Sequence, residues 1–540
     1  MHGRTPPDAE PAEPAEPESA RRGALGRAWR TFASAMEPAV FLPSATLVIG
    51  FVVFGGAATD IAAQTFDALR AFVLDTFGWL YVVGTSSILV VVVGLLVAVG
   101  GRGDLRLGRD DERPEFSRGA WFAMLFSAGM GTGLVYWGVA EPVHHALVQA
   151  PGVPLPGGST ASVDDREALA LAFFHWGLHP WAVYTLFGLA IAYFHFRRGL
   201  PLAPRSMLHP LLGDRIFGWP GHLVDVVATV GTLFGVATSL GFGAQQVNAG
   251  LTLIADVPPA DLGVQLALIA TMTAIATLSV VLGISGGIRR LSSFNMMLAG
   301  AMLVFVIAVG PTLRLPGLLS SSLGAYLGQL PIWGLHVSPP SSDGWQRDWT
   351  LFYWSWWVSW SPFVGVFVAR ISRGRTLRDF IASVLLVPTG VTFVWLTAMG
   401  GAGIRAAEAG RDTLVEAARS EPATALHELL AHLPGSTITM AAATVLIVVF
   451  FISSSDSGSL VDDIVTSGGH PNPPRIQRVF WAVSEGAVAA TLLAAGGLRA
   501  LRTASLQAGL PMMLVLLAAT WALLRALREE MTERPPHTPR

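Results

Sequence analysis

Long apolar stretches separated by short polar segments make up most of the chain from residue 38 onward. The hydrocarbon core of a bilayer is about 30 Å thick, so a helix of about 20 apolar residues can cross it. Twelve stretches reach that length, near residues 38–57, 79–100, 119–140, 168–196, 222–252, 263–283, 294–313, 349–370, 378–400, 436–456, 476–495 and 504–526. Two of them exceed the usual length, which indicates tilted or kinked helices. The pattern predicts an all-α integral membrane protein with twelve transmembrane helices.

The ten spans from residue 119 onward divide into two sets of five, which open at Trp121 and Trp349. Both openings are aromatic and interrupted by glycine or serine, which favours a five-plus-five inverted repeat. Charged residues at helical spacing between 401 and 435 also predict a surface helix. The expected organisation is a disordered, acidic and proline-rich cytoplasmic tail (1–37), two peripheral transmembrane helices (38–118), a first five-helix repeat (119–313), an outside loop (314–348), a second five-helix repeat (349–526) and a short cytoplasmic tail (527–540).

Composition agrees with a protein surrounded by membrane lipid: 52% of the residues are hydrophobic, 13% are charged, and the mean hydropathy is +0.53. All 35 basic residues are arginine, and most fall on segments that are cytoplasmic if the N-terminus is inside. We therefore expect a multi-pass protein of the cell inner (plasma) membrane with both termini in the cytoplasm. The net charge of -2 gives no case for a nucleic-acid partner, and the absence of cysteine excludes disulfides, thiolate catalysis and cysteine metal sites.

Three tryptophans lie unusually deep in the predicted span at 349–370. Tryptophans that serve as interfacial anchors lie within a few residues of the last polar group. Counted from the polar edge at Asp348, however, Trp356, Trp357 and Trp360 lie roughly 12–20 Å inward, near the middle of the bilayer. Helix packing is the ordinary use of a buried tryptophan. Three at this depth favour instead an aromatic site for a quaternary ammonium group, which is attracted to indole faces and cannot be satisfied by hydrogen bonds.

The fourth predicted span contains Pro180, whose missing amide donor frees the carbonyl of residue 176 and predicts a break in the helix there. Trp176 and Tyr184 are eight residues apart and face the same volume if the kink is modest. They are therefore candidates for the remaining walls of the aromatic site. His175 and His179 are candidate proton carriers. In the alternative, which the sequence favours, both rings are satisfied by carbonyls freed at the kink.

Glycines alternate in the third span, at Gly129, Gly131 and Gly133. Each glycine destabilises a helix by about 1 kcal/mol relative to alanine, so this segment is a candidate for local unwinding and a hinge. Unwound carbonyls near the midplane can coordinate Na⁺, and free amides can meet an anionic substrate group. The alternative is close helix packing through small residues. A phosphate loop is excluded because no Lys-Ser/Thr pair follows.

The tenth span ends in five serines and one aspartate within residues 453–459. Polar groups at membrane depth are costly unless they are paired or hydrated. Hard oxygen ligands suit an alkali cation, which makes this segment a second candidate for Na⁺ binding. The alternative is serines that bond back to the helix, and for Asp456 we favour a role as a local cap.

Together these segments resemble the betaine/choline/carnitine transporter (BCCT) family over nearly the whole membrane region. The resemblance is carried by Gly129-Met-Gly-Thr-Gly-Leu, Gly138-Val-Ala-Glu-Pro142, Phe174-His-Trp-Gly-Leu-His-Pro-Trp181, Phe234-Gly-Val-Ala-Thr-Ser-Leu-Gly241 and the stretches 349–375 and 451–459. It implies twelve helices, a five-plus-five inverted-repeat core of the amino-acid/sodium symporter type, and a homotrimer.

The resemblance also implies which residues bind. The family's aromatic box corresponds to Trp176, Tyr184, Trp356, Trp357 and Trp360. Its main sodium site corresponds to the carbonyls of Ser127, Met130 and Phe450 and the hydroxyls of Ser453 and Ser454. For a second sodium site, Thr232 and Phe363 match in part, but Val236 stands where a second hydroxyl is expected.

Proton-coupled choline relatives in the family tend to carry an aspartate at the place of Gly133. A glycine there favours Na⁺ coupling and a zwitterion, so we expect Na⁺-coupled import of a quaternary-ammonium osmolyte, first of all glycine betaine, with no further cofactor. The alternative is a proton-coupled symporter or a Na⁺-independent exchanger of choline, carnitine, ectoine or dimethylsulfoniopropionate. An enzyme is not expected, because neither a nucleophile–base pair nor a metal cluster is evident at one depth.

Overall fold

The computed structural model describes residues 36–98, 105–129, 131–148, 163–282, 285–310, 314–339, 344–471 and 473–533, and its regular elements in these ranges are all helices. The longer ones are α2 (Pro38–Ala57), α3 (Thr59–Ala98), α4 (Arg118–Gly129), α5 (Gly131–Leu147), α6 (Asp165–Trp176), α7 (Leu178–Ala192), α9 (Trp219–Ala255), α10 (Leu262–Leu282), α11 (Ser285–Val309), α12 (Leu315–Leu335), α14 (Thr350–Arg370), α15 (Leu377–Glu408), α16 (Asp412–Ser420), α17 (Ala425–Ala431), α18 (Ser436–Thr466) and α19 (Arg475–Glu533). Short helical turns lie at Tyr193–Arg197, Pro204–Leu208, α8 (His209–Leu212), Gly213–Phe217, α13 (Trp345–Asp348) and Pro422–Thr424.

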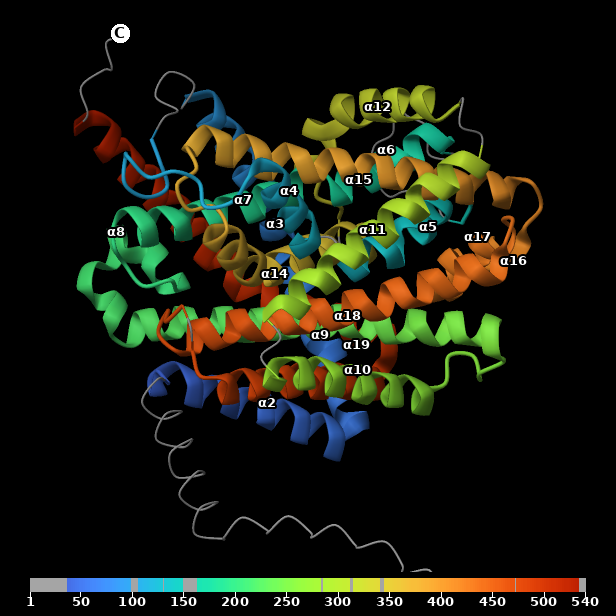
Figure 1. Ribbon diagram of the computed structural model, residues 1–540, viewed down its shortest axis with the longest axis horizontal. Coiled ribbons are helices and arrows are strands. Elements are labelled where there is room, and N and C mark those ends of the chain that lie inside the picture. Colours follow the sequence, from blue (N-terminus) through green and yellow to red (C-terminus); the bar gives the residue numbers. More distant parts are fainter. Residues whose placement is uncertain are drawn as a thin grey trace, which may run out of the picture.

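Many of these helices run side by side along one direction (Figure 1). Within the described ranges, seven are long and apolar enough to cross a membrane: α2, α3, α9, α10, α15, α18 and α19. The outer helices also expose large apolar side chains, among them Leu47 of α2 (56% exposed) and Leu278 of α10 (56% exposed). Large apolar side chains exposed on helices that are apolar enough to cross a membrane suit contact with lipid. The expected all-helical membrane fold is confirmed.

Two helices at the centre, α7 and α14, pack against each other and are buried on nearly all sides. A helix that is apolar all round belongs in a protein core or a membrane. Their position in the core explains why the aromatic residues of both helices come together, since each ring has protein rather than lipid around it.

Within the described residues, helix breaks occur at two places where the sequence has glycine. One helix ends at Trp176 and the next begins at Leu178, with Gly177 between them at φ −95° and ψ −121°. The break thus lies three residues before Pro180, which is accommodated in the first turn of α7. The unwinding expected around Gly129, Gly131 and Gly133 is not tested at Met130, which lies between α4 and α5 and outside the described residues, while Gly131 and Gly133 are part of the helix α5. In α19 the backbone leaves the helical conformation at Gly496 and Gly497, between the last two predicted spans.

The segment at 314–348, expected as an outside loop, instead contains the helices α12 and α13. The helix α12 packs on α6 (Figure 1), burying Tyr326 and Trp333 while Leu327 and Leu335 on the same helix stay exposed. It buries only one face, and it is not among the helices of the described residues that are apolar enough to cross a membrane, which explains why hydropathy alone did not distinguish it. The helix expected between 401 and 435 is present as α16 and α17, and it is preceded by the end of α15.

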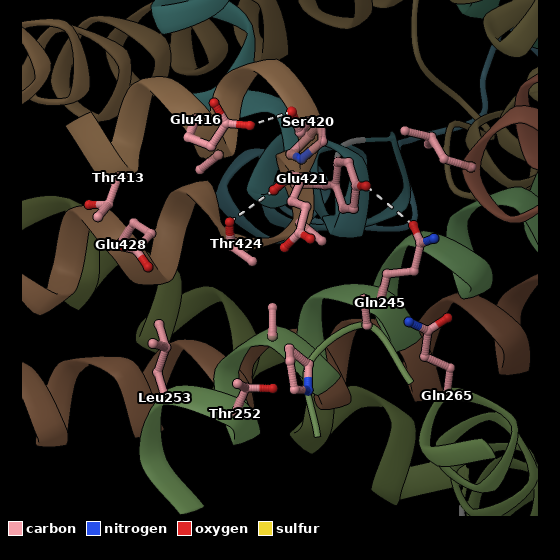
Figure 2. A pocket seen from close by; sticks show the side chains of 18 residues that line it. Gln245, Thr252, Leu253, Gln265, Thr413, Glu416, Ser420, Glu421, Thr424 and Glu428 are labelled. Carbon is pink, nitrogen blue, oxygen red and sulfur yellow. Dashed lines mark hydrogen bonds between the residues drawn. The ribbon is translucent and has the colours of Figure 1, made fainter. Parts of the chain in front are cut away.

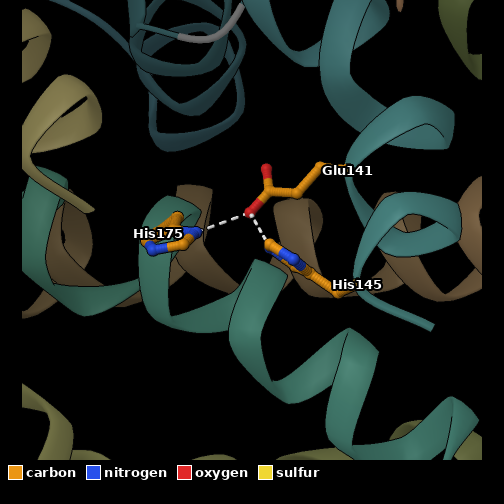
Figure 3. Close-up of side chains that lie close together, drawn as sticks. All are labelled: Glu141, His145 and His175. Carbon is orange, nitrogen blue, oxygen red and sulfur yellow. Dashed lines mark hydrogen bonds and ion pairs between the residues drawn. The ribbon is translucent and has the colours of Figure 1, made fainter. Parts of the chain in front are cut away.

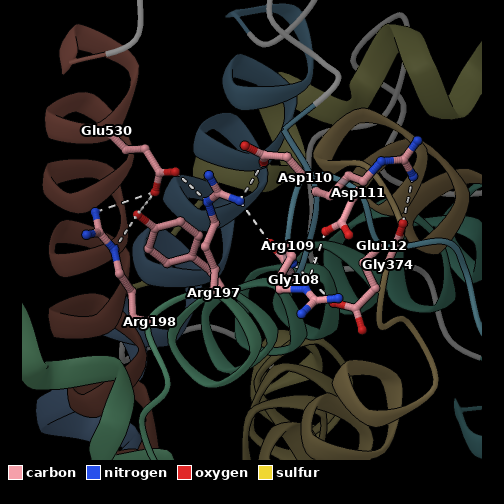
Figure 4. Close-up of polar contacts among 11 residues, drawn as sticks. Gly108, Arg109, Asp110, Asp111, Glu112, Arg197, Arg198, Gly374 and Glu530 are labelled. Carbon is pink, nitrogen blue, oxygen red and sulfur yellow. Dashed lines mark hydrogen bonds and ion pairs between the residues drawn. The ribbon is translucent and has the colours of Figure 1, made fainter.

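A network of ion pairs and hydrogen bonds links helices at one end of the bundle (Figure 4). Arg197, just after α7, pairs with Glu530 of α19 and lies 2.9 Å from an Asp110 carboxylate oxygen. Tyr193 donates a hydrogen bond of 2.6 Å to Glu530, and Arg198 lies 3.4 Å from the same carboxylate. The last helix is therefore tied to the end of α7 and to the segment before α4.

Candidate functional site

The break between α6 and α7 places two aromatic side chains beside the centre of α14. Trp176 is the last residue of α6, and Tyr184 lies in the second turn of α7. A Cβ atom built on Gly177 would lie 2.5 Å from the carbonyl oxygen of Phe173, so only glycine fits this turn without a shift. The glycine therefore allows the tight turn that places Trp176 and Tyr184 beside α14.

The rings of Trp176, Trp356 and Trp357 form one cluster, which we call the aromatic cage together with Tyr184 and Tyr353. Trp356 and Trp357 stack at 4.8 Å and 15°, and Trp176 meets Trp357 edge-on at 4.9 Å. Tyr353 lies 5.3 Å from Trp176, and Tyr184 lies 6.4 Å from Trp357. The structure thus brings together indole faces that are some 180 residues apart in the sequence.

Trp360 lies at the margin of the cage. Its ring is 6.0 Å from Trp356 and 5.5 Å from Phe363, and it packs closely against Gly235 of α9. Trp181, which was not among the candidates, lies 5.5 Å from Tyr184. Trp181 lies one helical turn before Tyr184, so the sequence could have identified it as a further candidate by this spacing.

Gly133 of α5 touches the cage from another side. A Cβ atom built there would lie 2.6 Å from Cη2 of Trp356 and 3.2 Å from Cη2 of Trp176. Real Cβ atoms essentially never approach so closely. Any side chain at this position would therefore have to displace the tryptophan rings.

A buried carboxylate that was not among the candidates, Glu141 of α5, holds the cage walls. One of its oxygens, Oε2, accepts hydrogen bonds from Nε1 of Trp176 at 2.7 Å and from the hydroxyl of Tyr353 at 2.6 Å. The other, Oε1, lies 2.6 Å from Nδ1 of His175. A buried charge is tolerated only when it is paired and hydrogen-bonded. These contacts meet that requirement and couple α5, α6 and α14.

Two histidines beside the break are held by side chains rather than by carbonyls freed at the kink. His175 bridges Glu141 and the Thr350 hydroxyl, which is 3.1 Å from its Nε2. His179 lies 3.3 Å from the Ser86 hydroxyl and stacks on Trp354 at 4.8 Å. Both nitrogens of His175 have partners, whereas Nδ1 of His179 has none among the described residues. The expected carbonyl partners were wrong because side chains from other helices reach both rings.

A further side chain, that of His145, also lies close to the Glu141 carboxylate. His145 is one helical turn further along α5, and its Nε2 lies 3.4 Å from Oε1 of Glu141 (Figure 3). Glu141, His145 and His175 each offer a ligand atom within 4.8 Å of the other two. A compact group of potential metal ligands is therefore present where the sequence analysis saw none.

The residues implied for the main sodium site are described only in part. Met130 lies outside the described residues, and Ser127 is on α4 with its side chain outside them. Gly131, the first residue of α5, packs against the Phe450 ring of α18, where a Cβ atom would be 2.8 Å from Cδ1. The Ser453 hydroxyl donates to the Phe450 carbonyl at 3.1 Å, and Ser454 is half-buried one residue further. The glycine segment and the serine run thus meet at Phe450.

Asp456, expected as a local cap, is instead paired with Arg478 of α19. The guanidinium also donates to the Asp456 carbonyl at 2.8 Å. A partner on another helix compensates the buried charge better than the helix's own backbone could, which is why the local interpretation was wrong.

The positions implied for a second sodium ion lie where α9 crosses α14. Thr232 is buried on α9, and its hydroxyl has no hydrogen-bond partner among the described residues. Phe363 is buried on α14. Val236, one turn after Thr232, packs near Gly458 of α18 and supplies no oxygen. The structure therefore places one free hydroxyl at this crossing.

A cavity of about 620 Å³ opens at the end of the bundle where α9 ends and α16 begins (Figure 2). Its lining includes three carboxylates, those of Glu416, Glu421 and Glu428. Tyr136 lies at its wall and donates a hydrogen bond of 3.2 Å to Gln245. The Tyr136 ring stacks on Phe242 at 4.7 Å, and Phe242 lies 5.2 Å from Trp356. Aromatic contacts through Tyr136 and Phe242 therefore link the wall of this acidic cavity to the cage.

Comparisons with known proteins agree with this geometry. The sequence model described as BCCT, betaine/carnitine/choline family transporter, matches residues 39–532. The chain is 46% identical over 506 residues to an uncharacterized transporter of Mycobacterium tuberculosis, covering 93% of this chain and 84% of that protein. It is 40% identical to a glycine betaine/proline/choline transporter of Vibrio parahaemolyticus, covering 91% and 90% of the two chains. It is 39% identical to a glycine betaine transporter of Bacillus subtilis, covering 89% and 93%.

These matches span the membrane region and include the helices that build the cage. The resemblance noted in the sequence is therefore confirmed. The family and the relatives are transporters rather than enzymes; the family is named for betaine, carnitine and choline, and the Vibrio and Bacillus relatives are both named as transporters of glycine betaine. The chain belongs to the betaine/carnitine/choline transporter family and is a multi-pass membrane transporter.

Proposed function

We propose that this chain imports glycine betaine by Na⁺ symport. The observation that carries the proposal is the convergence of Trp176, Trp356 and Trp357 in the protein core, with ring centroids 4.8 to 6.2 Å apart. A trimethylammonium group is attracted to the faces of such rings, and the attraction is strongest where water is excluded. The rings now pack on one another, so substrate entry requires them to separate.

Among the described residues no free carboxylate faces the cage, which favours a zwitterion over a cation. Gly133 leaves no room for an acidic side chain against Trp356. The nearest carboxylate, that of Glu141, is already engaged by Trp176, Tyr353 and His175. A substrate that carries its own carboxylate needs no further negative charge from the protein, whereas choline would benefit from one.

Sodium coupling is supported by the meeting of Gly131 with Phe450 and by the hydroxyl of Ser453 beside the Phe450 carbonyl. An ion bound by Ser127, Met130, Phe450, Ser453 and Ser454 would join the glycine segment of α5 to α18. Gly133 lies two residues from Gly131 and touches Trp356, so ordering of this segment would reach the cage directly. A second ion at Thr232 and Phe363 belongs to the same proposal.

The acidic cavity fits the outer mouth of the pathway. With both termini cytoplasmic, its end of the bundle faces outward, and Glu416, Glu421 and Glu428 would raise the local concentration of cations. Twelve spans, a five-plus-five inverted repeat, a homotrimer and a location in the inner membrane complete the proposal. Tyr136 and Phe242 would then form the barrier that opens toward the cage.

The direct test is uptake of labelled betaine into proteoliposomes that contain the purified protein. An inward Na⁺ gradient is imposed first, and then a proton gradient with Na⁺ absent. Uptake only with Na⁺ supports the proposal. Uptake driven by protons alone would overturn the coupling. If neither gradient drives uptake, betaine is the wrong substrate, and choline, carnitine, ectoine and dimethylsulfoniopropionate are tested in the same way.

A further inference from the structure

Next to the cage, three metal-ligating side chains from two helices converge in a fully buried position. Glu141 and His145 are four residues apart and so share one face of α5, while His175 comes from the last turn of α6. All three side chains have 0% exposure. The carboxylate Oε1 lies 2.6 Å from Nδ1 of His175 and 3.4 Å from Nε2 of His145.

His145 is the member of this group that hydrogen bonding leaves unexplained. Neither of its ring nitrogens has a hydrogen-bond partner of good geometry among the described residues. Buried polar groups are nearly always satisfied, and each exception calls for an explanation such as an ion. The ring is held in place by Trp345 at 5.4 Å and Trp349 at 4.7 Å, with Nε2 directed toward the carboxylate.

We propose that Glu141, His145 and His175 form a binding site for a divalent transition-metal ion, with Zn²⁺ the best match. Two imidazole nitrogens and one carboxylate oxygen suit Zn²⁺ rather than Mg²⁺ or Ca²⁺, which prefer oxygen ligands. Three protein ligands leave a fourth position for water, as in many zinc sites. The ligands are Oε1 of Glu141, Nε2 of His145 and Nδ1 of His175.

The surroundings supply the second shell that such a site needs. A metal-bound histidine usually donates its other N–H to an oxygen, which fixes the ring. The Nε2 atom of His175 is 3.1 Å from the Thr350 hydroxyl and can donate to it. The other oxygen of the Glu141 carboxylate stays anchored by Trp176 and Tyr353. For Nδ1 of His175 to coordinate, the neutral ring carries its proton on Nε2.

Metal binding at this site is expected to interfere with the cage. Tetrahedral ligands at about 2.0–2.1 Å from Zn²⁺ lie about 3.3 Å from one another. His175 and Glu141 are 2.6 Å apart, so they must move apart by roughly 0.7 Å to admit the ion. The His175 carbonyl accepts the Trp357 indole N–H at 2.9 Å, and Trp176 follows it in the chain. Displacement of His175 therefore shifts two cage walls, and the ion should act as an inhibitor.

The site can be tested without transport, by titrating the detergent-purified full-length protein with Co²⁺ after removal of metals by a chelator. Co²⁺ in a low-symmetry nitrogen–oxygen site has visible absorption bands that aqueous Co²⁺ shows only weakly. We expect one saturable site, from which Zn²⁺ displaces Co²⁺. His145→Phe keeps the ring packing against Trp349 but removes the ligand, and it should weaken binding at least about tenfold.

The matched control is His144→Phe, which changes the neighbouring and less buried histidine outside the cluster. It should bind Co²⁺ as the wild-type protein does. If His145→Phe aggregates on size exclusion, His145→Gln replaces it. The absence of a saturable Co²⁺ spectrum in the wild-type protein would overturn the proposal, and so would equal affinity in the His145 and His144 variants.

Uptake provides a second, separate readout. If betaine is transported, Zn²⁺ should inhibit the wild-type protein at least about tenfold more strongly than the His145 variant, each compared with its own uptake without metal. Zn²⁺ inhibition of equal strength in both would overturn the inhibitory role. The Co²⁺ titration does not depend on betaine being the substrate, so a failure of the transport proposal would leave the metal result intact, and the reverse also holds.

Discussion

The indole nitrogen of Trp176 donates a hydrogen bond of 2.7 Å to the carboxylate of Glu141. The same oxygen accepts the Tyr353 hydroxyl, so two cage residues from α6 and α14 take their orientation from one residue of α5. A hydrogen bond to a charged group contributes about 1.5–3 kcal/mol. The carboxylate is thus the point at which the three helices around the cage are joined.

Glu141→Gln should weaken betaine binding at least about tenfold, because the amide carries fewer acceptor sites for the three donors that converge on it. Binding to the purified protein can be followed by intrinsic tryptophan fluorescence. Glu167→Gln is the matched control, since Glu167 is also buried but belongs to the capping box at the start of α6. An unchanged affinity in Glu141→Gln would contradict the positioning role.

Trp357→Leu should weaken substrate binding by about 30-fold, because a desolvated cation–π contact is worth about 2 kcal/mol. Leucine keeps the site apolar, so the protein should still fold and elute as the wild type does. Trp354→Leu provides the comparison: Trp354 is equally buried in α14 but packs against Phe174 and His179 instead of the cage. Equal loss of affinity in both variants would show that general packing, not the onium site, is responsible.

Gly133→Ala should lower substrate affinity by about fivefold or more, because the added methyl group would overlap Trp356 and force ring displacement of the kind that costs roughly 1–3 kcal/mol. A Cβ atom there has only 2.6 Å to the ring. Gly94→Ala in α3, which has open space around its Cβ position, should have little effect. Isothermal titration calorimetry with betaine measures the affinity of each of the two variants. Wild-type affinity in Gly133→Ala would mean that the cage is wider in the binding state.

The double substitution Ser453→Ala and Ser454→Ala should raise the Na⁺ concentration for half-maximal uptake at least about tenfold, since each lost oxygen ligand removes one favourable contact of roughly 1 kcal/mol or more. Uptake is measured against Na⁺ at saturating betaine. Ser459→Ala removes a similar bond to a backbone carbonyl on the same helix and serves as the control. Uptake that keeps its Na⁺ dependence in the double variant would reject this site and favour an exchanger or a proton symporter.

Glu530→Gln should lower the thermal stability of the purified protein, because Arg197, Arg198 and Tyr193 all contact this largely buried carboxylate. Loss of a network of this kind costs about 2 kcal/mol or more. Glu529→Gln affects an adjacent, exposed pair with Arg525, which is worth about 0.5 kcal/mol or less. The melting temperatures of the two variants are compared by following protein fluorescence during heating in detergent. Identical midpoints would show that the network does not stabilise the fold.

The sequence determined the features that depend on local chemistry. Apolar runs predicted a helical membrane protein because lipid cannot satisfy exposed backbone groups. Depth along one helix singled out Trp356, Trp357 and Trp360 as aromatic candidates near the middle of the bilayer. The resemblance to the family was also readable from the residues alone, and it supplied candidates for the cage and the sodium sites, but not Tyr353 of the cage.

Only the tertiary structure decided which residues meet across helices. The partnership of Glu141 with His175 spans 34 residues, and that of Asp456 with Arg478 joins two helices. Neither pair could be predicted from helical periodicity, because the two partners lie on different helices. Which residues meet depends on how those helices pack against each other. The position of the break at Gly177, three residues before Pro180, was likewise decided by close packing against Phe173 and Phe393. The hydrophobicity of a segment can be calculated from its own residues. The partner of a buried charge depends on which helices lie beside it in the folded bundle.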